Sequence, residues 1–110
     1  MIKIESTEEF QQALKEDDHF FLLKHSLTCP ISQAAYEEYE DHEKNHGDTK
    51  HYYLAVQDAR PLSNYIADTF QIKHESPQAI LFKNEDVAWH ASHWKITTKS
   101  LANALEENSK

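Results

Sequence analysis

The chain contains a single cysteine, Cys29, and the residues around it are of types that activate a thiol. Cys29 follows a short apolar run, Phe20–Leu23, and directly precedes Pro30. Proline is favoured in the first turn of a helix, because the N–H that it lacks has no partner there. We therefore expect Cys29 at a helix N-terminus, where unpaired backbone N–H groups and the helix dipole favour the thiolate. A thiolate in that position is a nucleophile.

Cys29 and Ser32 have the spacing of a Cys-x-x-Cys redox site, with serine in the second position. Such a site can attack a disulfide and hold a mixed disulfide, but it has no second thiol with which to release it. The hydroxyls of Thr28 and Ser32 are candidate donors to the thiolate. Two simpler readings stay open: Cys29 as a small buried side chain, and Ser32 as an ordinary first-turn residue.

Length and composition predict one domain over residues 1–110, with 39% hydrophobic residues including 2 Trp, 5 Tyr and 5 Phe for a core. The net charge is −8 and no lysine or arginine cluster is present, which argues against binding to nucleic acid or to an anionic membrane. We expect proteins and small molecules as partners.

The first residues have no apolar signal region and the chain has no run of about 18 apolar residues, so a cytoplasmic location is expected. A lone cysteine fits a reducing compartment.

The elements that would hold Cys29 can be read from local patterns in the first half of the chain. Ser6 and Glu9 form a capping box for a helix that ends near Asp17. The next element is a strand, Phe20–His25, whose continuous apolar run is typical of burial on both faces. A helix then runs from Pro30 to about His46, with Gly47 expected as its left-handed C-terminal cap.

The faces of this helix are distinguished by residue type, since its apolar side and its acidic side each repeat at helical spacing. The apolar side is predicted to comprise Ile31, Ala34, Ala35 and Tyr39, and the solvent side Glu37, Glu38, Glu40, Asp41 and Glu43. A second strand, His51–Val56, follows. Strand, helix and strand of these lengths predict a parallel crossover.

The second half of the chain predicts a helix opening at Asp58–Pro61, a strand Gln78–Phe82, a hairpin return Val87–His90 and a closing helix Thr97–Leu105. The resulting order is that of a thioredoxin-like α/β fold. It has a central four-stranded mixed sheet flanked by helices and an extra N-terminal helix. In that context we expect the Ser76–Pro77 peptide bond to be cis, although a trans proline leading a strand is the alternative.

Three segments together resemble the monothiol bacilliredoxins, the YtxJ-type bacillithiol-system family of low-GC Gram-positive bacteria: Thr28–Ser32, Ser76–Gln78 and Trp89–Thr97. The resemblance implies an enzyme of redox homeostasis and stress response that removes bacillithiol from cytoplasmic proteins, with Cys29 taking the bacillithiol onto itself. It implies bacillithiol as co-substrate, no bound cofactor, and a second low-molecular-weight thiol that resets Cys29. The alternative is a non-catalytic sensor or adaptor whose Cys29 is reversibly thiolated. A scaffold that shares an iron–sulfur cluster between subunits is disfavoured by Pro30–Ser32.

The same resemblance implies an anionic thiol as substrate, and an acidic protein needs local positive charge to receive it. On the predicted topology the nearest candidates are Lys24, His25, Lys73 and His74. The backbone of Ser76, presented by Pro77, is predicted to pair with the substrate in the manner of a strand. Trp94 is either a core residue or a wall of the active-site surface.

The chain has 8 histidines, and several have spacings that raise the question of a metal site. His42 and His46 are one helical turn apart with His51 nearby, while His90 and His93 follow a predicted strand. A zinc site needs three or four convergent ligands, and the cysteine is already assigned to thiol chemistry. We therefore expect no metal.

Overall fold

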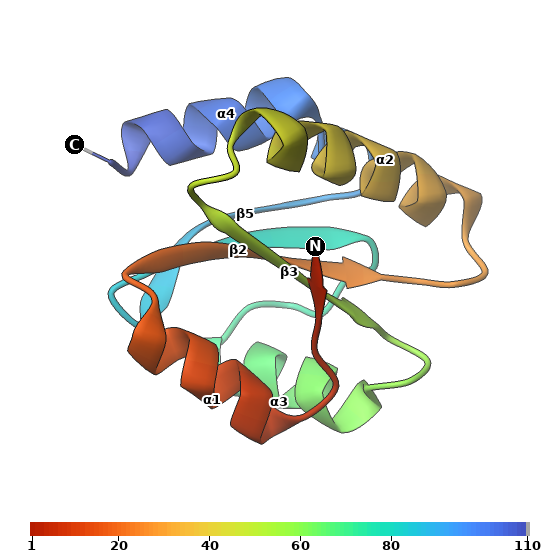
Figure 1. The fold of residues 1–110 in the computed structure, drawn as a ribbon. Helices are drawn as coiled ribbons and strands as arrows, with labels where there is room; N and C mark the ends of the chain where they lie inside the picture. The colour runs from red at the N-terminus through yellow and green to blue at the C-terminus, as the bar shows by residue number, and fades with distance from the viewer. Residues whose placement is uncertain (110) are drawn as a thin grey trace.

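The computed structural model describes residues 1–109 and contains a mixed sheet of five strands in the order β1-β3-β2-β4-β5. The strands are β1 (Ile2–Lys3), β2 (His19–His25), β3 (Lys50–Ala55), β4 (Gln78–Lys83) and β5 (Asp86–Ser92). The helices are α1 (Thr7–Glu16), α2 (Pro30–Asn45), α3 (Arg60–Phe70) and α4 (Thr98–Glu107), with a 3₁₀ turn η1 at His93–Lys95. Helices α2 and α4 cover one face of the sheet, and α1 and α3 cover the other (Figure 1).

The central strand β2 pairs in parallel with β3 and antiparallel with β4, and β5 returns antiparallel beside β4. The predicted four-stranded sheet is thus one strand short, because β1 adds a parallel edge beside β3. Only Ile2 and Lys3 form that strand, pairing with Tyr52 and Tyr53. Two residues carry no alternation of apolar and polar side chains, so the pattern gave no signal for β1.

The run Phe20–Leu23 is buried on both faces of the sheet, as its composition predicts. Side chains alternate across a strand, so Phe20 and Leu22 pack with the α1/α3 layer, while Phe21 and Leu23 pack with the α2/α4 layer. The alternation continues to the end of β2. Lys24 and His25 therefore enter opposite layers.

The caps at the helix ends agree with the sequence-based predictions in one case and differ in another. The capping box at Ser6 and Glu9 is present. Helix α2 ends at Asn45, but Gly47 is not its left-handed cap: His46 is the cap, with φ −138°, and no glycine has positive φ. The chain leaves α2 through a residue with negative φ, which any residue can adopt, so glycine is not required. The left-handed cap belongs instead to α3, at Gln71 with φ 55°.

The β4–β5 hairpin turns through Asn84 and Glu85, both with positive φ (52° and 65°). This is the backbone of a type I′ turn, which matches the twist of the two strands. Asn84 also donates its N–H to the Asp18 carbonyl at 2.8 Å, which fixes the turn against the segment between α1 and β2.

Two of the five acidic residues expected to face solvent on α2 have structural roles instead. Glu43 forms an ion pair with the amino group of Met1 at 2.8 Å, and Glu38 accepts the N–H of Thr98 at 3.0 Å. Glu37, Glu40 and Asp41 are exposed as predicted. Helix α2 is thereby tied to β1 and to the start of α4.

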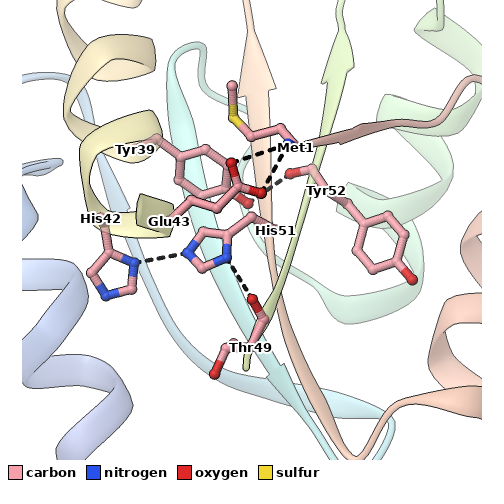
Figure 2. A network of polar contacts seen from close by, with 7 residues as sticks. All are labelled: Met1, Tyr39, His42, Glu43, Thr49, His51 and Tyr52. Carbon is pink, nitrogen blue, oxygen red and sulfur yellow. Dashed lines mark hydrogen bonds and ion pairs between the residues drawn. The ribbon is translucent and has the colours of Figure 1, made fainter. Parts of the chain in front are cut away.

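Beside the Glu43 ion pair lies a pair of buried histidines that connects α2 to β3 (Figure 2). His42 Nδ1 is 2.8 Å from His51 Nε2, and His51 Nδ1 donates to the Thr49 carbonyl at 2.8 Å. Because His51 Nδ1 carries a hydrogen, the neutral His51 ring accepts at Nε2, and His42 must donate to it from Nδ1. The neutral His42 ring then has no hydrogen on Nε2, which is buried and has no partner among the described residues. Burial lowers the pKa of His42 to about 4, with the nearby His46 and His51 as lesser causes.

A metal ion would need at least three histidine, cysteine or acidic side chains close together. Residues 1–109 contain no such group. Within the same range, no helix combines the length and the apolar character that crossing a lipid bilayer requires.

Candidate functional site

Cys29 is the N-terminal cap of α2, with extended backbone angles (φ −108°, ψ 120°) and Pro30 in the first turn. This is the position that the sequence predicts. The cysteine is partly exposed, and the first turn of the helix has no acidic residue. The sulfur is therefore carried at the end of the helix where the backbone N–H groups are unpaired and no carboxylate of the first turn opposes the helix dipole.

Ser32 lies one turn into α2, but its hydroxyl does not serve the sulfur as predicted. It is fully buried, accepts the N–H of Ser26 at 2.8 Å and lies 2.8 Å from His25 Nδ1, to which its hydrogen can be donated. Both functions of the hydroxyl are thus used in holding the β2–α2 loop. Thr28 is exposed, and the described contacts include no hydrogen bond from its hydroxyl to Cys29.

His25 is buried between Ser32 and the ring of Tyr36, whose centroid lies 4.8 Å away. Burial lowers the pKa of His25, and the hydrogen bond to Ser32 only partly opposes this. The imidazole is neutral near pH 7. His25 therefore does not provide the positive charge that was predicted for it, and it supports the active-site loop instead.

Lys24 is also enclosed, on the opposite face of the sheet. Its Nζ donates to the Ser63 carbonyl of α3 at 3.0 Å and lies 3.3 Å from His74 Nδ1. Burial lowers its pKa to about 8. The predicted contact of Lys24 with an incoming anion is thus wrong, because no part of the side chain reaches solvent. Ser63, whose hydroxyl is 3.2 Å from His74 Nδ1, gave no signal in the sequence.

The loop that precedes β4 carries the second half of the predicted site. Its Ser76–Pro77 peptide bond is cis, as expected. Gln78 pairs with Lys24 in the antiparallel β2–β4 ladder, so Pro77 lies beside the end of β2, the end from which the chain continues to Cys29. Pro77 accepts the His93 N–H at 3.1 Å. The register thus brings this loop and Cys29 to the same end of the sheet.

Lys73 and His74 are both exposed in that loop, but they differ in charge. Burial of part of the His74 ring lowers its pKa, and the positive charges of Lys24 and Arg60 lower it further. His74 is therefore mainly neutral at pH 7, and of this pair Lys73 is the one that carries the positive charge.

Trp94 lies in η1 and is 71% exposed, so it is a surface residue and not part of the core. With Ile31 and Ala34 of α2 it lines a groove of about 600 Å³. Ile31 is two residues beyond Cys29. The structure therefore places Trp94 on the same side of the molecule as the start of α2. This position agrees with the prediction that Trp94 forms a wall of the active-site surface.

The model of the family described as monothiol bacilliredoxin BrxC matches residues 2–101 of this chain. The chain belongs to the monothiol bacilliredoxin family. A solved structure described as an oxidoreductase candidate with a thioredoxin fold is 44% identical to this bacilliredoxin family member. It covers 94% of this chain and 92% of its own, with a TM-score of 0.90. The family and the fold together support a thiol redox function.

More distant structures share the fold of this family member. A thioredoxin from Plasmodium falciparum is 12% identical, with a TM-score of 0.78 over 97% of this chain and 98% of its own. A thioredoxin from Malassezia sympodialis is 16% identical, with a TM-score of 0.80 over 100% of this chain and 92% of its own. The predicted thioredoxin-like fold is thus confirmed.

Proposed function

We propose that this chain removes bacillithiol from mixed disulfides on client proteins, with Cys29 carrying the bacillithiol between two exchange steps. The observation that carries the proposal is the placement of a single, partly exposed cysteine as the N-cap of α2, without an acidic residue in the first turn. Membership of the monothiol bacilliredoxin family supports bacillithiol as the small thiol.

The first step is a thiol–disulfide exchange in which no net oxidation occurs. The Cys29 thiolate attacks the bacillithiol sulfur of the client's mixed disulfide and forms a new S–S bond with it. The bond between client and bacillithiol breaks, and the client sulfur leaves as a thiolate that takes a proton from solvent. Backbone N–H groups at the start of α2 stabilise the attacking sulfur.

The second step needs a thiol from another molecule, because Cys29 is the only cysteine of the chain. The thiolate of a second bacillithiol attacks the bacillithiol sulfur held on Cys29. The products are the symmetrical bacillithiol disulfide and a restored Cys29 thiolate, so one free bacillithiol is oxidised for each client cysteine that is reduced. Lys73 is the exposed cation suited to receive the anionic thiol, and the backbone of Ser76 is suited to pair with the substrate.

A second candidate function is a redox sensor in which Cys29 keeps its adduct. The observation that favours it is the single cysteine of the chain: Ser32, one turn along the helix, is a buried hydroxyl and not a thiol, so no second thiol of the chain can release the adduct. The two functions differ only in the second step. A sensor accepts the adduct from the client but does not return it to free bacillithiol at a useful rate.

Intact-mass analysis of each exchange step tests both functions. The reduced protein is mixed with a client that carries one bacillithiolated cysteine. We expect the adduct mass to move to the wild-type chain and to return to solution when bacillithiol is added, whereas Cys29→Ser accepts nothing. Glu8→Gln, an exposed change on the opposite face, is the purification control. Equal rates of client release with wild type and Cys29→Ser would refute the enzyme, and transfer without return would identify the sensor.

A further inference from the structure

The groove beside Trp94 starts at Ile31, two residues beyond Cys29, and runs along α2 away from the cysteine. It lies between α2 and η1 and has a volume of about 600 Å³. On the helix side it is lined by Ile31 and Ala34 near Cys29, and further along by acidic residues that recur at helical spacing. On the other side the exposed Trp94 presents a large apolar surface to water. An exposed aromatic side chain bordering a hollow is typical of a binding surface.

The acidic residues of this groove are available to a partner. Glu37 and Glu40 are exposed, and neither takes part in the ion pairs found among residues 1–109. Asp41 has only a surface contact with Lys44, at 3.6 Å. Lys95, although adjacent to Trp94, is not among the residues that line this groove and lines a neighbouring hollow instead.

We infer that this groove binds a basic segment of the client protein, adjacent in sequence to the thiolated cysteine. An arginine or lysine of that segment would lie over the Trp94 ring and pair with the carboxylates of α2. The same carboxylates would repel an anionic small thiol and direct it to the side of the site where Lys73 lies. The inference rests on the proposed function and adds to it the class of client.

The length of the groove sets where the basic residue should be. Glu37 and Asp41 are eight and twelve residues beyond Cys29, which corresponds to about 12 and about 18 Å along the helix axis at 1.5 Å per residue. An extended peptide advances about 3.3 Å per residue. The basic residue is therefore expected about four or five positions from the client cysteine.

The test uses matched synthetic peptides with a central bacillithiolated cysteine. They carry arginine, glutamine or glutamate four and five positions away, on the N-terminal side in one set and on the C-terminal side in another. We expect kcat/KM for adduct transfer to be about tenfold higher for arginine than for glutamate in one of the sets, as an ion pair plus a cation–π contact would give. The preference should weaken with added salt.

Two variants locate the preference on the protein. Glu37→Gln/Glu40→Gln should abolish it, whereas Glu8→Gln/Asp68→Asn should retain it. The second pair removes the same charge from exposed residues of α1 and α3, on the other face of the sheet. If the preference for the arginine peptides disappeared equally in both variants, it would come from the overall charge of the protein. That result would overturn the inference that the groove binds the basic segment. Equal rates for all peptides with wild type would overturn it too, while leaving the proposed function intact.

A binding measurement separates the inference from the chemistry. Peptides with alanine in place of cysteine cannot exchange, and their binding is followed by the fluorescence of Trp94, with Trp94→Phe as the reference for Trp89. Saturable binding of the arginine peptide to wild type, absent in Glu37→Gln/Glu40→Gln, supports the groove even if no peptide is dethiolated. Absence of both binding and transfer overturns the groove and the proposed function together.

Discussion

The two faces of the sheet bury ionisable bases that respond in different pH ranges. The α1/α3 face encloses Lys24, whose pKa is lowered by burial to about 8. The α2/α4 face encloses His25, His42 and His51, whose pKa values are also lowered chiefly by burial. On both faces burial disfavours the charged form, so the unfolded chain binds protons more readily. Stability should therefore rise with pH twice, once in acid and once in alkali.

The acid range gives the largest expected effect. The unfolded pKa of His42 is 6.5 and its folded pKa is about 4. The stability contribution is complete above pH 6.5 and is lost as the pH falls to 4, because the unfolded state takes up the proton first. The loss from His42 alone is about 3 kcal/mol, and His25 and His51 add to it.

Urea unfolding at pH 7 and at pH 4.5 measures this loss. His42→Leu should be less stable than wild type at pH 7, since His51 loses a partner, but it should lose less stability on acidification. His90→Gln, a change at an exposed histidine, is the control and should retain the wild-type acid loss. An unchanged acid loss in His42→Leu would show that the histidine pair does not set the response of this face.

The alkaline range tests the buried lysine of the other face. Lys24 releases its proton at about pH 8 when folded and near 10.5 when unfolded, so stability should rise by about 3 kcal/mol across that interval. Below pH 8 the charge is present in both states and the cost of its burial is constant. Lys24→Met should remove the rise, whereas the exposed Lys99→Met should keep it. Urea unfolding midpoints of the wild type and the two variants at pH 7.5 and 10 measure this rise.

A smaller effect distinguishes hydrogen bonding from titration on the α2/α4 face. Ser32→Ala leaves the Ser26 N–H and His25 Nδ1 without their shared partner in a buried site, at a cost of about 2 kcal/mol in unfolding free energy at pH 7. Thr28→Ala, which removes an exposed hydroxyl from the same loop, should cost much less. Equal urea midpoints for the two variants would mean that water replaces the Ser32 contacts.

The position of the sulfur could be predicted because its signals are local. Pro30 marks a helix start, the apolar run before it marks a buried strand, and Pro77 precedes an apolar strand in the same manner. The cis bond followed once the topology was assigned. These signals depend on backbone preferences within a few residues, and such preferences survive in the folded chain.

The roles of Lys24 and His25 could not be predicted in this way. Both were placed correctly in a strand, yet their burial depends on Ser63, 39 residues away, and on Ser32, which folds back from α2. A lysine next to an apolar run is most often exposed, and no local pattern distinguishes one that a helix later covers. The role of Glu43 on α2 is likewise not predictable from local sequence, since its partner is the amino group of Met1.

The single thiol at the start of α2 has a kinetic consequence if Cys29 turns over as proposed. The chain has no second thiol that could expel what Cys29 has captured, so the lifetime of the loaded form is set from outside, by the supply of reduced small thiol. When that supply falls, loaded molecules accumulate and capture stops. The occupied fraction of the protein would then track the thiol reserve of the cell.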